Sequence, residues 1–221
     1  NIRSGGVMSL SGVEVKNTVT NQGTLESTDC TYSSYIKIST TTGLSGSNNT
    51  FTGECFRLDG FSGVTGDLLP FLSEDCSDEV YIGFYGNIYT TTISNISDIL
   101  PGGYKLVYHL TVASGHTVTL EEGVSINQQN LDINVKGTLK AEYAEVADAF
   151  VSTTDGASLY VEKGGVVELQ NANINFSRYG EVYVYDGGCF SMTGGSMFAS
   201  YYGTNIRSGG VMSLSGVEVK N

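Results

Sequence analysis

Hydrophobic residues recur in a fixed pattern within five windows of eleven residues. The windows are KGTLKAEYAEV from Lys136, GGVVELQNANI from Gly164, GGCFSMTGGSM from Gly187, GGVMSLSGVEV from Gly5 and QGTLESTDCTY from Gln22. Glycine is always second, and mostly apolar or small residues stand at positions four, six, nine and eleven. Because side chains alternate between the two faces of a strand, each window predicts a strand, a corner and a second strand. The pattern predicts stacked core columns formed by Leu139, Val167, Phe190, Met8, Leu25, Leu169, Met192, Leu10, Val146, Ile174, Met197 and Val15.

The windows recur at unequal steps, with their second-position glycines at Gly137, Gly165 and Gly188 and at Gly6 and Gly23. A constant core register with unequal steps is typical of a solenoid whose corners carry loops of different length. The pattern therefore predicts an all-β parallel β-helix of about nine coils. Residues 33–103 fit the pattern less well, so we expect less regular coils there, with longer loops and a small excursion around residues 61–71.

The sequence NIRSGGVMSLSGVEVKN occupies residues 1–17 and recurs unchanged at residues 205–221. Since Asn1 recurs as Asn205, the two copies are offset by 204 residues. We interpret residues 1–221 as one solenoid segment, a single period of a longer tandem array plus a short overlap. Residues 205–221 would then be the first coil of the next period, which would rise by about 43 Å. A duplication introduced by engineering is the alternative.

The run YKLVYHLTVASGHTVTLEEGVSINQQNLDINVKGTLKAEYAEV, residues 104–146, alternates apolar and polar residues around Gly115, Gly123 and Gly137. This run resembles the strand pattern of right-handed parallel β-helices in large secreted bacterial or archaeal surface proteins, adhesin-like or filament-forming. The resemblance covers Tyr104 to the end of the period and continues to Tyr32. It is a resemblance of pattern and not of a catalytic motif. It implies a right-handed parallel β-helix (β-solenoid) and an extracellular or cell-surface location.

Composition and charge further limit the possible folds and functions. The chain has 29 glycines, 2 prolines and only 15% charged residues, which favours many short strands joined by tight turns. A net charge of -12 opposes nucleic-acid binding, because phosphate recognition needs clustered Lys and Arg. No apolar stretch is long enough to span a membrane. The densest acidic stretch, EDCSDE at residues 74–79, lacks the order of a calcium loop, so we interpret it as a solvated turn, with calcium binding as the alternative. No other cofactor is expected.

Catalytic chemistry has little support in the sequence. His109 and His116 stand at expected strand and turn positions, and no GxSxG, HExxH or CxxC motif or phosphate-binding loop is present. Carbohydrate-active β-helices use clustered charged residues on an outer sheet, but here Lys140 and Glu142 are interpreted as an ordinary solvated face. The sequence therefore predicts a protein that is not an enzyme.

Tyrosines form the most distinctive outward pattern. Tyr160 and Tyr183 are expected in one outward column, and Tyr179 and Tyr202 in another. Such columns could hold sugar rings on their aromatic faces. They could equally be self-stacking ladders that stabilise the contact between coils by about 0.5–1.5 kcal/mol per pair.

Three cysteines stand in similar contexts, STDC at Cys30, TGEC at Cys55 and SEDC at Cys76. Their spacing of about one coil predicts a single column. Neighbours in such a column could form a disulfide or remain reduced and buried, and the sequence leaves both open. Cys189 takes the place of Val166 and Val211 in its column and is expected to be free.

These expectations favour a structural role. The primary hypothesis is a repeat module of an extracellular filament, sheath or adhesin stalk, whose partners are neighbouring copies stacked end to end. The alternative is a carbohydrate-binding or carbohydrate-active β-helix that uses the outward tyrosines, with surface glycans as partners.

Overall fold

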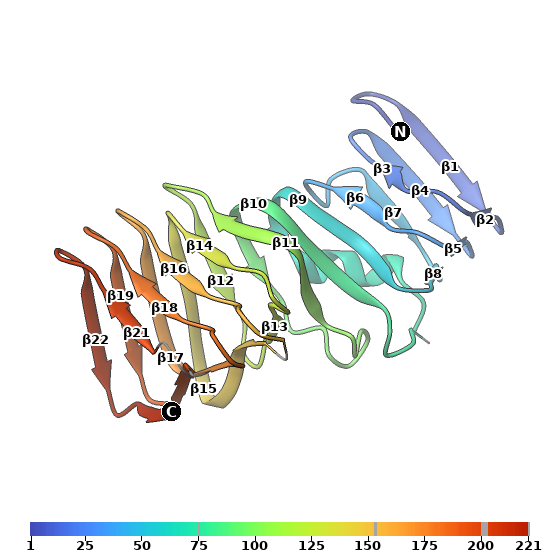
Figure 1. The fold of residues 1–221 in the computed structure, drawn as a ribbon. Coiled ribbons are helices and arrows are strands. Elements are labelled where there is room, and N and C mark those ends of the chain that lie inside the picture. The colour runs from blue at the N-terminus through green and yellow to red at the C-terminus, as the bar shows by residue number, and fades with distance from the viewer. Residues whose placement is uncertain (75, 153, 200–202, 221) are drawn as a thin grey trace.

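The chain forms a β-solenoid of about eight turns, in which parallel strands stack along one axis (Figure 1). The computed structural model describes residues 1–74, 76–152, 154–199 and 203–220. The first strands and the last strands lie at opposite ends of the stack. The predicted fold class is confirmed, and the number of turns is close to the nine expected.

Two short ladders belong to the N-terminal turns, and in each a strand pairs with the strand one turn later. The first ladder stacks β1 (Val7–Ser11), β4 (Thr24–Thr28) and β7 (Leu44–Ser47). The second stacks β2 (Glu14–Val15), β5 (Thr31–Tyr32) and β8 (Thr50–Phe51).

The longest ladder extends from one end of the solenoid to the other. It stacks β3 (Val19–Thr20), β6 (Ile36–Ile38), β9 (Glu54–Val64), β10 (Tyr81–Ile93), β11 (Tyr104–Val112), β13 (Ile126–Asn127), β15 (Thr138–Val151), β17 (Val166–Phe176), β20 (Ser196–Ala199) and β23 (Glu218–Lys220).

Two further ladders complete the C-terminal turns, and both begin at the long strand β10. One continues through β11 to β14 (Ile133–Val135), β16 (Leu159–Val161), β18 (Val182–Val184) and β21 (Thr204–Ile206). The other continues through β12 (Thr117–Leu120), β15 and β17 to β19 (Cys189–Thr193) and β22 (Val211–Ser215).

Glycine at the second window position is required by close packing at the corners between turns. A Cβ atom at Gly137 would clash with the backbone oxygens of Ala113 and His116, and one at Gly165 with the backbone oxygen of Val135. Since only glycine lets the backbone approach so closely, these residues fix where each turn begins.

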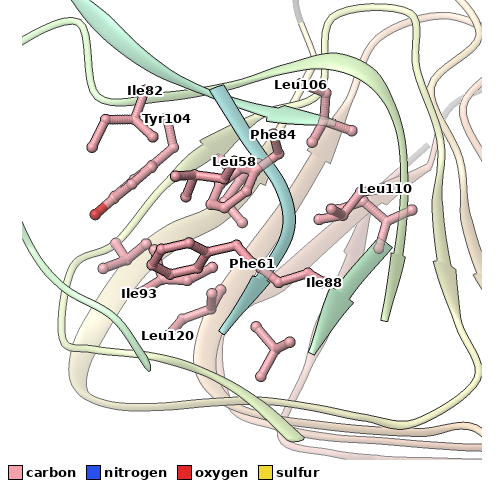
Figure 2. Close-up of a cluster of buried hydrophobic side chains, with 14 of the residues drawn as sticks. Leu58, Phe61, Ile82, Phe84, Ile88, Ile93, Tyr104, Leu106, Leu110 and Leu120 are labelled. Atoms are coloured by element: carbon pink, nitrogen blue, oxygen red, sulfur yellow. The ribbon is translucent and has the colours of Figure 1, made fainter. Parts of the chain in front are cut away.

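The interior is one continuous apolar core made of side chains from successive turns. Figure 2 shows its central part, where side chains from β9, β10 and β11 converge. Leu58 pairs in register with Phe84, and Phe84 pairs with Leu106, so three consecutive turns supply one column. All three side chains are buried. Stacking in register therefore removes each apolar side chain from water above and below at once.

The predicted irregular segment contains the single helix among the described residues, the 3₁₀-helix η1 (Thr65–Phe71). It follows β9 within the expected excursion. A buried polar network anchors the start of η1, because the Tyr104 hydroxyl lies 2.6 Å from Thr65 Oγ1 and donates to the Ser94 backbone oxygen at 2.9 Å. No helix in the described part of the chain is long and apolar enough to cross a membrane.

Most of the predicted core positions lie inside. The side chains of Leu139, Val167 and Phe190 stack in one column, and Ala141, Leu169 and Met192 stack in the next. Other predicted positions are buried or packed against the core, namely Leu25, Ile174, Met197, Met8, Leu10 and Val15.

Val146 is the exception, and its predicted place in the core is wrong. Its side chain is 60% exposed, and Phe150 pairs with Ile174 in its stead. The register shifts because β15 carries extra residues between Glu142 and Ala147. A window of constant length cannot detect such a bulge.

Contacts from both neighbouring turns hold this bulge in place. The Glu122 carboxylate accepts hydrogen bonds from the backbone N–H groups of Ala144 (2.6 Å) and Glu145 (3.4 Å). On the other side, Asn171 Nδ2 donates to the backbone oxygens of Tyr143 (2.9 Å) and Ala144 (3.3 Å). The bulge is therefore a fixed feature of the outer surface.

The predicted cysteine column is also wrong. The backbone N–H of Cys30 donates to the Asn49 side chain on the next turn, and Asn49 pairs in turn with Leu72. Cys55 is fully buried, whereas Cys76 is half-buried. The three cysteines therefore do not form one column. The step from Cys30 to Asn49 is 19 residues, shorter than the 25 residues to Cys55, whereas the step from Glu54 to Tyr81 is 27 residues, longer than the 21 residues from Cys55 to Cys76.

None of the four cysteines, all of which lie within the described residues, forms a disulfide, and the Cys76 thiol donates to the Ser73 backbone oxygen at 3.2 Å. Cys189 pairs with Val166 on one side and with Val211 on the other, which is the column that the sequence predicts for it.

Candidate functional site

The two copies of the seventeen-residue sequence adopt the same turns at opposite ends of the solenoid. Gly5 and Gly209 have φ angles of 77° and 85°, and Gly12 and Gly216 have φ angles of 64° and 63°. Both pairs lie in the left-handed region that favours glycine. The sequence therefore specifies this coil locally, whichever neighbour it stacks on.

Hydrogen bonds and ion pairs within the coil are repeated as well. Gly6 N–H donates to the Arg3 backbone oxygen at 2.8 Å, and Gly210 N–H donates to the Arg207 backbone oxygen at 2.9 Å. The exposed Glu14–Lys16 pair (3.4 Å) recurs as Glu218–Lys220 (2.9 Å).

The first copy bonds only to the turn that follows it. Its Gly12 N–H donates to Thr28, and its Gly6 and Val13 oxygens accept from Thr24 and Thr31. The backbone groups outside its strands that bond to the next turn are Ile2 N and O, Gly6 O, Gly12 N, Val13 O and Val15 O.

The second copy bonds only to the turn that precedes it. Its Val211 N–H donates to Gly188, and its Ser215 oxygen accepts from Gly194. The backbone groups involved are Arg207 N, Gly209 O, Val211 N, Ser215 O and Glu218 N, which correspond to Arg3 N, Gly5 O, Val7 N, Ser11 O and Glu14 N of the first copy.

The two sets of backbone groups do not overlap. In a parallel strand, alternate residues direct their N–H and C=O groups to opposite neighbours. One copy uses one edge of the coil and the other copy uses the opposite edge, with the same side chains directed inward. A single such coil could therefore bond to a turn below and a turn above at the same time.

The inward side chains of the coil pair with core residues on both edges. Met8 pairs with Leu25 on the following turn, and its counterpart Met212 pairs with Phe190 on the preceding turn. The apolar residues of the second copy remain partly uncovered, since Ile206, Leu214 and Val219 are 51%, 40% and 57% exposed.

The outward tyrosine column lies near this coil. Tyr160 and Tyr183 pair in register, and their rings stack with centroids 5.4 Å apart and an interplanar angle of 24°. Tyr185 adds a third ring 5.9 Å from that of Tyr183, and the Arg207 guanidinium lies 5.7 Å from the Tyr183 ring. The rings face one another along the axis, as in a stabilising ladder.

The hydroxyl groups of this column are tied to nearby polar residues. A hydrogen bond to Glu181 raises the pKa of Tyr183, and partial burial raises the pKa of Tyr160. Of the second predicted column, Tyr179 is 43% exposed, and Tyr202 lies outside the described residues.

The sequence patterns did not predict a charged and aromatic cluster that extends from Tyr35, next to β6, over β9 and β10 to β11. The Arg57 guanidinium donates to both carboxylate oxygens of Glu54 (3.0 and 2.6 Å) and to the Tyr35 hydroxyl (2.7 Å). Lys105 Nζ lies 4.3 Å from the Tyr81 ring centroid. The cluster residues follow one another at intervals of about one turn, namely Tyr35, Arg57, Tyr81 and Lys105. This spacing could have predicted that they stack on neighbouring turns. Because these groups pair with one another, the cluster stabilises the contact between neighbouring turns.

The two histidines lie on different parts of the surface. In β11, His109 Nδ1 lies 3.1 Å from the Asp132 backbone nitrogen and 3.2 Å from its carboxylate. Burial raises the pKa of Asp132, and His109 opposes that rise. His116 Nδ1 lies 3.1 Å from Thr90 Oγ1, with Tyr89 against the ring. The structure does not bring the two histidines into one constellation.

Other polar residues that the sequence singled out have local partners. The Lys140 ammonium pairs with Glu168 on the next turn (2.5 Å). Of the acidic stretch 74–79, residue 75 lies outside the described residues. Within the described part of the chain, no group of three or more His, Cys, Asp or Glu side chains is placed to hold a metal ion.

No protein-family model matches the chain, and no curated protein or solved structure shows significant similarity to it.

Proposed function

We propose that this chain is a structural repeat module of an extracellular filament, sheath or adhesin stalk, in which periods stack end to end into one continuous β-solenoid. The module works by coil-to-coil hydrogen bonds and a shared apolar core. The extracellular location rests on the resemblance of residues 104–146 to secreted β-helices.

One observation supports the stacking most directly. Residues 1–16 bond to the following turn and the identical residues 205–220 bond to the preceding turn, through different backbone groups and with the same left-handed glycines. A strand whose pairing is shifted by one residue would direct its apolar side chains to the solvent face. The coil at residues 205–221 can therefore serve as the first coil of a following period without a register shift.

The apolar columns also continue across such a junction. Phe190 below and Leu25 above would enclose the single methionine that is Met212 in one copy and Met8 in the other. The half-exposed Leu214 and Val219 would become covered by Ser27 and Tyr32, the partners of Leu10 and Val15. Covering apolar surface favours continuation of the rod.

A chain of two periods tests this proposal, with residues 1–204 followed directly by residues 1–221. We expect one rod of about twice the length by small-angle X-ray scattering, because each turn adds about 4.8 Å. A matched chain in which Leu10 and Val15 of the second period are replaced by aspartate should behave as two jointed rods, because unpaired charges are costly in the shared apolar core. If the direct fusion scatters like this control, the periods do not form a continuous solenoid.

We do not extend the proposal to carbohydrate binding. Sugar rings pack on free aromatic faces, whereas Tyr160 and Tyr183 direct theirs toward each other and Arg207 covers part of the outer one. These contacts favour the ladder interpretation of the tyrosine column.

A further inference from the structure

We propose that a basic peptide segment of another protein docks along one corner of the solenoid, in an acidic groove beside η1 and the connection between β10 and β11 (residues 94–103). The groove lies on the side of the rod and uses neither end of the stack. Docking there is a function beyond the proposed structural role, and it does not depend on the stacking of periods.

The larger part of the groove is a hollow of about 730 Å³ beside η1. Its wall contains the apolar side chains of Leu69, Pro70, Leu72 and Ile99. Leu72 is buried, whereas Leu69 is half-buried and Pro70 is exposed, so apolar surface remains open to solvent there. A hollow with an apolar wall suits one large apolar side chain that anchors a partner.

A second hollow, of about 210 Å³, borders the same connection between β10 and β11. Ile96, Pro101 and Val124 line it, together with Asn95. The Asn95 backbone N–H donates to the Glu121 carboxylate at 3.3 Å, so an acidic group stands beside this hollow as well. The two hollows lie on neighbouring turns, which stack about 4.8 Å apart, so one extended peptide can contact both.

The charge of this segment identifies the class of partner. Residues 58–104 contain no Lys, Arg or His but seven acidic residues, namely Asp59, Asp67, Glu74, Asp75, Asp78, Glu79 and Asp98. Of these, Asp59 pairs with Lys37, and Glu74 lines the larger hollow. On the opposite wall, Asn48 donates to the Asp29 carboxylate at 2.6 Å, which adds a further negative charge.

The carboxylates next to the larger hollow are not neutralised by this chain. Among the described residues, no ion pair joins Asp67, Glu74 or Asp98 to a basic side chain. All three are exposed, and Asp67 and Asp98 adjoin the lining residues Gly66 and Ile99. A negative field around an apolar hollow favours a partner whose positive charges flank an apolar side chain. A basic peptide with one apolar anchor has this chemistry.

The chain contains no Trp, which permits a direct binding test. The probe is a peptide of two lysines, glycine, tryptophan, glycine and two lysines, whose tryptophan emission shifts to the blue when the indole leaves water. Titration with the full chain should give a saturable shift with one site per chain. Binding should weaken as salt screens the exposed charges. The matched peptide with glutamate in place of every lysine should not bind.

Removal of charge locates the site. Glu74→Gln with Asp98→Asn removes two of the acidic groups at the larger hollow and should weaken binding of the probe about five-fold, because each exposed ion pair contributes little by itself. The matched control is Glu142→Gln with Glu145→Gln, which removes two exposed carboxylates outside the groove and should bind the probe like wild type.

Removal of apolar surface tests the anchor. Leu69→Gln should weaken binding of the probe about ten-fold, because the indole loses part of its apolar contact. The matched control is Val146→Gln, at an exposed position outside the groove, which should bind like wild type. Circular dichroism and the thermal midpoint check that each variant folds. If Leu69→Gln does not fold, the charge variant still decides the question.

Three results would overturn the proposal. The first is no saturable binding of the lysine peptide at low salt. The second is binding of the glutamate peptide with equal affinity, because the acidic groove would then select no charge. The third is wild-type affinity in the folded blocking variants, because the peptide would then bind elsewhere on the chain.

Discussion

The Asn49 side chain joins Cys30 on one side to Phe71 on the other. Its Oδ1 accepts the backbone N–H of Cys30 at 3.1 Å, and its Nδ2 donates to the backbone oxygen of Phe71 at 2.8 Å. The same amide accepts from the Ser27 hydroxyl at 2.9 Å and donates to the Ser27 backbone oxygen at 2.8 Å. Asn49 is fully buried, and its one side chain satisfies polar groups on the preceding turn and on the following turn.

Asn49→Ala should lower the free energy of unfolding by about 2–4 kcal/mol, because it leaves buried backbone and hydroxyl groups without partners. Urea unfolding followed by circular dichroism measures the change. Asn48→Gly is the matched control, since Asn48 is exposed and has a φ of 57° that glycine adopts freely. Equal losses in the free energy of unfolding for the two variants would show that the buried network does not stabilise the fold.

The sequence predicted the columns where strands are regular and failed where the turn geometry is set by tertiary contacts. The alternation of apolar residues around Leu139, Val167 and Phe190 suffices to place them in one column, because period two is a local property of a strand. The bulge of β15 depends instead on Glu122 and Asn171, which lie on neighbouring turns. No local pattern encodes these contacts.

The candidate site was predictable only in part. The identity of residues 1–17 and 205–221 pointed to this coil in the sequence. Only the hydrogen bonds of the structure reveal that the two copies use opposite edges of the coil. The cysteine spacing misled because turns near Cys30 differ in length from the average turn. The network around Asn49 left no trace in the sequence, since buried and exposed asparagines look alike there.

The register of β15 yields a direct test. Val146→Asp should change the free energy of unfolding by less than about 0.5 kcal/mol, because Val146 is exposed. Phe150→Ala should cost about 3–5 kcal/mol, because Phe150 is fully buried opposite Ile174. Chemical unfolding of both variants measures the difference. The reverse order of losses would restore Val146 to the core.

A charge in the central column should be costly. Leu169 is buried between Ala141 and Met192, so Leu169→Asp should destabilise the fold by several kcal/mol, about 3–5. Gln170→Asp is the control, since Gln170 is the next residue and is exposed. A thermal midpoint of Leu169→Asp equal to that of the control would contradict the inward register of β17.

Alkaline pH should unfold the solenoid through its buried tyrosines. Burial raises the pKa of Tyr104 and Tyr143 well above the usual value near 10. The unfolded chain therefore loses these protons first. The stabilising effect is complete below about pH 10 and falls by about 1.4 kcal/mol per pH unit and buried tyrosine above it.

Tyrosinate absorbance and circular dichroism, recorded together, check this pH dependence. The buried Tyr104 and Tyr143 should ionise only as the strand signal is lost, because burial raises their pKa. Tyr104→Phe removes one buried tyrosine, so it should reduce the loss of stability at alkaline pH by about 1.4 kcal/mol per pH unit. Tyr108→Phe, at a site where the side chain is 50% exposed, is the matched control for removal of a tyrosine hydroxyl. Ionisation of every tyrosine before any unfolding would contradict the prediction.

The tyrosine ladder can be separated from a sugar platform by a double-mutant cycle. Tyr160→Ala and Tyr183→Ala should each lower stability, with a coupling of about 0.5–1.5 kcal/mol, because their rings stack at 5.4 Å. Tyr160→Ala with Tyr89→Ala is the matched pair and should show no coupling, since Tyr89 packs against His116 instead. Titration of wild type with neutral oligosaccharides, followed by tyrosine fluorescence, completes the test. A coupling near zero combined with saturable sugar binding that both alanine variants abolish would mean that the rings act as a binding surface and not as a fastening between turns.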